Sequence, residues 1–409
     1  MLLGVMALLT AIIIIITLVR MKFKLGFVML SGAIIIAVFA RLHPINFANI
    51  VLHSVISIET VRVVLIIIGI TALGHLLKAT GNLDDIIVSL KAVISDTRIL
   101  LVIIPALMGL MAVPGGAIMS APLIEKMGDE LGLDRVSLTT INVVFRHICT
   151  YLYPICAGYI LITSMTNILA IEFIKFNIPV LLLTMTMAFK YIFHSIKPNR
   201  TEKIKPNPRA IIKLVFNFSP FIIILLSALV FKVNFPLAIL IGILYVMFIT
   251  KREPNYADSI KNRMLISIKG IKWDIILAIV GIMIFKDIVS VTGFLDEISL
   301  YLVRTGTPLF VLAIMFPLIA GFITGNNSAA IGLTVPLFLQ IIPQGVNPVP
   351  YYNLIYVSTV TSHIFSPFHP CLILTAEYYN TSLINVLKQV TIICSWIIVA
   401  ALIEFMIIA

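Results

Sequence analysis

The stretch VRVVLIIIGITALGHLLKATGNLDDIIVSL, residues 61–90, decides the fold, because residues 273–302 repeat it as WDIILAIVGIMIFKDIVSVTGFLDEISLYL. One constant offset aligns Gly69 with Gly281, Thr80-Gly81 with Thr292-Gly293 and Leu83-Asp84 with Leu295-Asp296. Matches that keep their order at a fixed spacing are the signature of an internal repeat. The sequence therefore predicts that one structural unit occurs twice.

The matches continue beyond these stretches and set the boundaries of the two copies. With short insertions, Pro105, Gly109, Pro122, His147 and Pro154 align with Pro317, Gly321, Pro336, His363 and Pro370. Copy one is predicted at 1–195 and copy two at 211–409. The segment between them, 196–210, is polar and contains prolines, which is typical of a linker.

The composition indicates a membrane protein. Hydrophobic residues make up 60% of the 409 and charged residues only 11%, far from the balance of soluble domains. Apolar runs long enough to cross a bilayer predict ten spans, at 2–19, 25–41, 61–79, 136–167, 170–195, 211–231, 234–250, 273–291, 351–380 and 384–408. The net charge of +11 is typical of cytoplasmic loops rich in Lys and Arg, and we expect no nucleic-acid partner.

Each copy also contains an apolar segment too short to cross and return. Residues 99–127 break at Pro114-Gly115-Gly116, and residues 308–342 break between Gly325 and Ser328. The resumed piece of the first segment is about 16 Å of helix, roughly half of a hydrocarbon core. Both segments are predicted to be re-entrant helical hairpins that enter and leave on one side of the membrane.

Five crossings and a hairpin per copy are an odd count of crossings, so the second copy must be inverted relative to the first. Placing both termini outside puts 21 of the 29 Lys and Arg residues in inner segments and five in outer ones, as expected for the cytoplasmic membrane. The predicted fold is an all-α polytopic membrane protein with two inverted-topology repeats. Such repeats are a recurring plan of secondary transporters.

The fourth span of each copy is predicted to break near the midplane, around residues 146–154 and 362–370. Proline interrupts a helix, and open backbone at membrane depth is tolerated only around a cavity. Arg146 lies in the first break, and its guanidinium suits a carboxylate or phosphate. The alternative is that Arg146 pairs internally, with Glu377 or a hairpin carbonyl.

The remaining candidates surround these breaks and the hairpin tips. His147, His363 and His369 suit proton coupling or are ordinary structural histidines. Asn326, Asn327 and Ser328 offer oxygens to Na⁺, or simply form a turn. The full set of candidate substrate-binding residues is Gly115, Gly116, Ser120, Arg146, His147, Asn326, Asn327, Ser328, Thr334, His363 and His369. Cys149, Cys156, Cys371 and Cys394 show no metal-ligand spacing and are expected to be small buried hydrophobes.

The segments VPGGAIMSAP (113–122) and ITGNNSAAIGLTVP (323–336) resemble the ion transporter superfamily, which includes gluconate, citrate and dicarboxylate permeases. The chain is most similar to an uncharacterised prokaryotic branch of that group. The resemblance implies that the hairpin tips bind substrate and often Na⁺, that transport uses an elevator motion, and that the protein is a homodimer. It also implies that the first, second and last spans of each copy form the scaffold. Dicarboxylate relatives carry Ser-Asn-Thr at each tip, whereas this chain has Pro-Gly-Gly and Asn-Asn-Ser.

The predicted function is secondary active transport of a small organic anion across the cytoplasmic membrane, coupled to Na⁺ or H⁺ and without a further cofactor. An enzyme is not expected, because the chain has no HExxH or GxSxG motif, and a pump is not expected without a nucleotide loop. Three alternatives stay open. They are an intramembrane enzyme that uses His147, His363 and His369, an anion channel on the same fold, and a permease that needs separate subunits.

Overall fold

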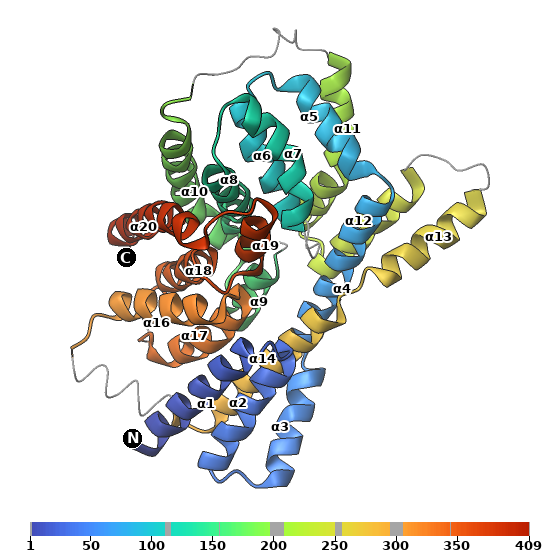
Figure 1. Cartoon of the computed structure of the whole chain (residues 1–409). Helices are drawn as coiled ribbons and strands as arrows, with labels where there is room; N and C mark the ends of the chain where they lie inside the picture. The colour runs from blue at the N-terminus through green and yellow to red at the C-terminus, as the bar shows by residue number, and fades with distance from the viewer. Residues whose placement is uncertain are drawn as a thin grey trace.

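The computed structural model describes residues 2–110, 116–154, 156–196, 208–249, 256–294, 306–343 and 345–408, and all regular secondary structure in these ranges is helical. Figure 1 follows the chain from the amino to the carboxyl terminus. The first half contains α1 (Leu2–Arg20), α2 (Leu25–Phe39), α3 (Pro44–Ile56), α4 (Ile58–Ala79), α5 (Asn82–Val93), α6 (Thr97–Leu110), α7 (Gly116–Glu130), α8 (Arg135–Ile148), the 3₁₀ turn η1 (Cys149–Tyr151), α9 (Ala157–Thr166) and α10 (Ala170–Phe193). The second half contains α11 (Pro208–Leu225), the π-helical turn η2 (Leu226–Val230), α12 (Phe235–Ile249), α13 (Tyr256–Lys269), α14 (Trp273–Val291), α16 (Leu309–Thr324), α17 (Asn327–Ile341), α18 (Val349–Ile364), α19 (Pro370–Tyr378) and α20 (Leu383–Ile408).

Several of these helices are suited to a bilayer. By length and composition, four segments of the described chain are able to cross a membrane: Ile58–Ala79, Ala170–Phe193, Pro208–Ala228 and Leu383–Ile408. Large apolar side chains remain exposed along them, among them Leu182, Ile212 and Ile407. A surface of this kind is typical of a protein embedded in lipid, so the expectation of a helical membrane protein is confirmed.

The helices form two groups that lie side by side (Figure 1). In the first group, which contains α1–α5 and α11–α14, α2 packs on α14, α4 on α12, and α11 on α5. In the second group, which contains α6–α10 and α16–α20, α6 packs on α8, α16 on α18, and α10 on α20. The groups meet where α14 contacts α17, α4 contacts α9, and α1 contacts α16.

The last helix of each half does not lie where the family resemblance placed it. Both α10 and α20 belong to the second group, where each contacts α8 and α18. Thr140 Oγ1 on α8 donates to Gln389 Oε1 on α20 at 2.9 Å, and the rings of Tyr191 and Trp396 lie 5.5 Å apart between α10 and α20. The expectation that these last spans join the first two as scaffold is therefore wrong for this fold.

Two glycines let the backbones of α2 and α14 touch in the first group. A Cβ atom at Gly26 would lie 2.5 Å from the carbonyl oxygen of Leu277, and a Cβ at Gly281 would lie 2.5 Å from the carbonyl oxygen of Gly26. Small residues let membrane helices approach until their backbones touch, which increases dispersion contacts without any hydrophobic driving force. These two glycines therefore fix the spacing of the helices.

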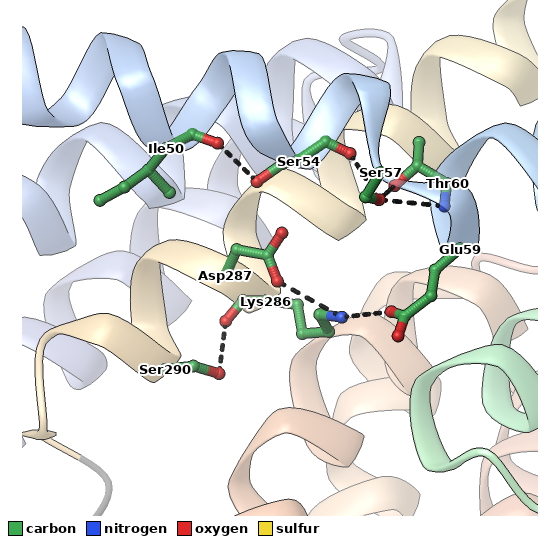
Figure 2. Close-up of polar contacts among 8 residues, drawn as sticks. All are labelled: Ile50, Ser54, Ser57, Glu59, Thr60, Lys286, Asp287 and Ser290. Carbon is green, nitrogen blue, oxygen red and sulfur yellow. Dashed lines mark hydrogen bonds and ion pairs between the residues drawn. The ribbon is translucent and has the colours of Figure 1, made fainter.

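An ion-pair cluster holds the same group together at one end of α14 (Figure 2). The Lys286 ammonium lies between two carboxylates, 3.1 Å from Glu59 Oε2 on α4 and 3.3 Å from Asp287 Oδ1. Ser57 accepts a hydrogen bond from the Thr60 backbone N–H and so caps the start of α4. The Lys286–Glu59 ion pair thus links α14 to α4.

Gly281→Ala is expected to destabilise the protein by about 1 to 3 kcal/mol, because the added methyl meets a backbone oxygen that cannot move alone. Gly69→Ala is the matched control: the repeat aligns it with Gly281, but its Cβ would meet only a methyl group of Ile239, at 2.7 Å. Melting temperatures of both variants in detergent check this. An equal loss in the two variants would contradict a backbone-limited α2–α14 contact.

Candidate functional site

The fourth span of each half is interrupted near its middle. In the first half α8 ends at Ile148, η1 follows, and α9 begins at Ala157; in the second half α18 ends at Ile364 and α19 begins at Pro370. Arg146 and His147 occupy the last turn of α8, and His363 occupies the last turn of α18. Two helix ends and two helix starts therefore supply the polar groups of the site.

Side-chain hydrogen bonds join the first break to α18 and the second break to α16. The Tyr356 hydroxyl on α18 donates to the carbonyl oxygen of Thr150 at 2.7 Å, and the Tyr151 hydroxyl lies 2.9 Å from Thr361 Oγ1. Ser366 Oγ donates to the carbonyl oxygen of Phe322 on α16 at 2.6 Å. An unpaired carbonyl in an apolar interior costs free energy, so these hydrogen bonds stabilise the interrupted helices.

The tip of the second hairpin lies against the second break. Gly325 ends α16 with φ +59°, a left-handed conformation, and a Cβ there would meet the backbone of Phe368. Asn326 then caps α17, since its Oδ1 accepts from the Ala329 N–H at 3.0 Å. The corresponding tip of the first hairpin, which includes the candidate Gly115, lies outside the described residues, and Gly116 begins α7.

The three candidate histidines, which come from both halves, form one cluster. The ring centroids of His147 and His363 are 5.3 Å apart, those of His147 and His369 are 4.5 Å apart, and those of His363 and His369 are 3.9 Å apart. His147 Nδ1 is 2.8 Å from the carbonyl oxygen of Val143, and His363 Nδ1 is 2.9 Å from that of Gly325. A carbonyl only accepts, so both rings carry their proton on Nδ1 and leave Nε2 free.

Arg146 is buried beside this cluster, with 5% of its surface exposed. No ion pair joins it to a carboxylate within the described ranges, its Nη1 has no hydrogen-bond partner, and its neighbour is the Cys371 thiol. Glu377, the internal partner considered from the sequence, is exposed and forms no such pair. A buried charge without a counter-charge is costly, so Arg146 is poised to take an anion.

A cavity of about 620 Å³ lies next to the cluster, between the two helix groups. Lys22 and Phe23 line it from the first group, whereas the tip residues Gly325 and Asn326 line it from the second. Pro370 of the second break also lines it. A second cavity of about 580 Å³, between α4 and α12, has an almost wholly apolar lining and lies away from the histidines.

The other candidates differ in whether their side chains already make hydrogen bonds. Asn327 Oδ1 is buried without a partner, and Ser328 beside it is half-buried. Ser120 Oγ donates to Asn142 Oδ1 at 2.6 Å, and Thr334 Oγ1 donates to the Ala330 carbonyl oxygen at 2.7 Å. The Ser120 contact joins α7 to α8, whereas the Thr334 hydrogen bond stays within α17. Neither hydroxyl is bonded to the three histidines.

Sequence reasoning missed Cys371. It was expected to be a small buried hydrophobe, but it lies half-buried in the first turn of α19, where its sulfur approaches His147 and His369. The run His369-Pro370-Cys371 carried a usable signal, because it places two potential metal ligands at one helix start beside the break. A search limited to CxxC spacing passes over it.

Comparison with known proteins adds a family but no activity. One protein-family model, described as "Protein of unknown function (DUF401)", matches residues 2–408. No curated protein matches the chain. The match spans both halves, so the family is defined by the complete fold and not by one segment.

Tyr356→Phe is expected to lower stability by about 1 to 3 kcal/mol, because it removes the 2.7 Å hydrogen bond to the half-buried Thr150 carbonyl and leaves that oxygen with the weak Cys156 thiol donor at 3.9 Å. Tyr352→Phe is the matched control, since Tyr352 lies one turn earlier on α18 and its hydroxyl makes no hydrogen bond among the described residues. Thermal unfolding in detergent measures both. Equal melting temperatures for the two variants would show that the Tyr356–Thr150 hydrogen bond does not stabilise the break.

Proposed function

We propose that this chain, which belongs to the DUF401 family of proteins of unknown function, is a secondary active transporter of a small organic anion of the carboxylate type. It works in the cytoplasmic membrane and couples transport to Na⁺ or H⁺. The observation that carries the proposal is Arg146, a buried arginine at a helix break with no carboxylate partner in the described chain. An ionised residue inside a membrane protein marks a functional site by default.

Helix ends add to the attraction for an anion. Both α17 and α19 begin beside the histidine cluster, since Gly325 next to α17 contacts His363 and His369 itself caps α19. The amino terminus of a helix carries unpaired N–H groups and a partial positive charge, which favour bound anions. Arg146 and these two ends together form a positive site, and the planar guanidinium favours a carboxylate.

The packing supports two copies of one unit in opposite orientations. The contact of α6 with α8 recurs as α16 with α18, α4 with α12 recurs as α14 with α2, and α13 with α4 recurs as α3 with α14. In each case, replacing every helix by its counterpart in the other half gives a helix pair that is also in contact. Inverted repeats supply two equivalent conformations, which is the usual basis of alternating access.

The cavity favours a cytoplasm-facing state of such a cycle. Its wall includes Lys22 in the loop after α1, which lies inside when both termini lie outside. Arg20, at the end of α1, lies over the Phe368 ring at 5.0 Å and connects the two helix groups at the cavity edge. In an elevator motion the second group would slide past the first and carry the site to the outer side.

The coupling ion has two candidate binders. Asn327 has a buried side-chain oxygen without a partner, whereas Asn326 already uses its oxygen as a helix cap. Na⁺ is a hard cation that prefers oxygen, so Asn327 with Ser328 and nearby carbonyls is the sodium candidate. The histidine cluster is the proton candidate, since imidazole titrates near neutral pH.

A thermal-shift screen tests the anion site. The purified protein is heated with a panel of organic and inorganic anions, with and without Na⁺ and at two pH values. A ligand at a hundred times its dissociation constant stabilises the fold by about 2.7 kcal/mol. We expect a carboxylate to raise the melting temperature of the wild type and of Arg62→Ala, which changes the distant apolar cavity, but not of Arg146→Ala. Counterflow in proteoliposomes then separates carrier from channel.

No stabilisation by any anion, or equal stabilisation of Arg146→Ala, would overturn the anion site. Arg146→Lys adds a geometric control, because lysine keeps the charge but loses the planar donor pair. A carboxylate that still binds this variant with full affinity would show that charge alone suffices. Product formation in place of counterflow would identify an enzyme.

Substituted-cysteine labelling tests the orientation. A membrane-impermeant maleimide added outside intact cells is expected to label Arg41→Cys, between α2 and α3, and not Lys22→Cys, between α1 and α2, because the latter loop is predicted inside. Permeabilised cells supply the control in which both positions react. The reversed pattern would invert the topology and turn the cavity outward.

A further inference from the structure

Three potential metal ligands meet at the second break. His147 on α8 and His369 and Cys371 at the start of α19 each offer one ligand atom, and these atoms all lie within 4.8 Å of one another. His369 is 1% exposed, and the other two residues are half-buried. The group combines two imidazoles with one thiol, and nothing in the anion proposal requires the thiol.

His369 is buried with both ring nitrogens unbonded. Neither Nδ1 nor Nε2 of its ring makes a hydrogen bond, although the residue is almost completely buried. Buried polar atoms in folded proteins are nearly always paired, so an exception points to a missing ligand or ion. Its ring stacks near His363, with centroids 3.9 Å apart and planes tilted by 35°, and this contact leaves the nitrogens unsatisfied.

The neighbouring contacts prepare these residues for metal. The Nδ1–H of His147 donates a hydrogen bond to the Val143 carbonyl oxygen at 2.8 Å, which leaves the Nε2 lone pair available to a metal ion. Histidines that bind metal usually donate their other N–H to a carbonyl or carboxylate in this way. Cys371 lies in the first turn of α19 beside Arg146, and a cysteine binds metal through its deprotonated sulfur.

We propose that His147, His369 and Cys371 form a binding site for a divalent transition-metal ion of borderline softness, of which Zn²⁺ is the type. Nitrogen and sulfur donors select such ions over Na⁺, Mg²⁺ and Ca²⁺, which prefer oxygen. Binding releases the thiol proton to solvent and forms one metal–sulfur and two metal–nitrogen bonds. The site stands on its own geometry, whatever the transport substrate is.

The distances fit after a small closure. Zn–N bonds of about 2.0 Å and a Zn–S bond of about 2.3 Å in a tetrahedron place the ligand atoms about 3.3 to 3.5 Å apart. The separations of up to 4.8 Å therefore need side-chain movements of about 1 Å, within the range of small rotamer adjustments. A chain of histidines for protons fits less well, because no hydrogen bond joins the three rings in the described chain.

Three ligands leave one position of a tetrahedral ion open, as in catalytic zinc sites. Arg146 lies beside Cys371 with Nη1 unpartnered, so a carboxylate could bridge the metal and the guanidinium. This role of the metal as part of the anion site rests on the proposed function. The metal site itself does not, and the two are measured separately.

The test is metal binding by the full-length protein in detergent, without any anion from the transport panel. Protein stripped with EDTA is titrated with Zn²⁺ and Co²⁺, bound metal is quantified by mass spectrometry, and the Co²⁺ complex is examined by absorption. We expect stoichiometric binding and a thiolate-to-cobalt charge-transfer band in the wild type and in Cys149→Ser. Cys149 is a half-buried cysteine of the other break and serves as the matched control. Cys371→Ser is expected to lose the band, and His369→Ala to lose most of the affinity.

A second measurement needs no variant and so does not depend on variants folding. Zn²⁺ is expected to protect Cys371 of the wild type from alkylation and to leave the reactivity of Cys149 unchanged, as read by peptide mass spectrometry. Substoichiometric metal that all variants retain equally, or protection of neither cysteine, would overturn the site. Metal binding without any anion-induced stabilisation would support this site and count against the transport proposal. Anion-induced stabilisation without metal binding would support the transport proposal and overturn the metal site.

Discussion

Everything in this structure depends on how two interrupted helices satisfy their backbone groups in an apolar interior. An unpaired carbonyl at that depth is costly, and irregular backbone is tolerated only where protein or a wet cavity receives it. Tyr356 on one broken helix donates to Thr150 in the other break, and Tyr151 returns the contact through Thr361. The first break therefore takes a backbone hydrogen-bond donor from the second half. This contact and the Tyr151–Thr361 contact hold the two copies together beside the site.

The chemistry of the site comes from differences between the copies. When the sequences are aligned on His147 and His363, Arg146 corresponds to Ser362, His369 to Tyr153, and Cys371 to Ile155. Only the histidine pair is shared. Both copies contribute a broken helix to the site. The positions that differ between the copies place the Arg146 cation, the unbonded His369 imidazole and the Cys371 thiol there. A symmetric site would present each group twice, with two buried arginines repelling one another across the axis.

The two helix groups differ in what holds them. The first is fixed by backbone-to-backbone contact at Gly26 and Gly281 and by the Lys286 ion pairs. The second contains the breaks, the hairpins and the histidine cluster. Between them lie the cavity and the contact of Arg20 with Phe368. Close packing on one side and a binding site on the other is compatible with the sliding motion that we propose.

The sequence by itself determined the long apolar helices, the positions of the helix breaks and the meeting of the three histidines. Those features follow from local causes: apolar length, proline and glycine interruptions, and a repeat whose matching positions must occupy equivalent places. It missed the short helices α3 and α13, which are too brief to span, and it misassigned α10 and α20, whose partners are set by packing. Only the tertiary structure revealed that Arg146 has no carboxylate partner among the described residues and that Cys371 joins His147 and His369. Those contacts depend on how closely α19 approaches α8, and no pattern within either segment encodes a distance between segments so far apart in the chain.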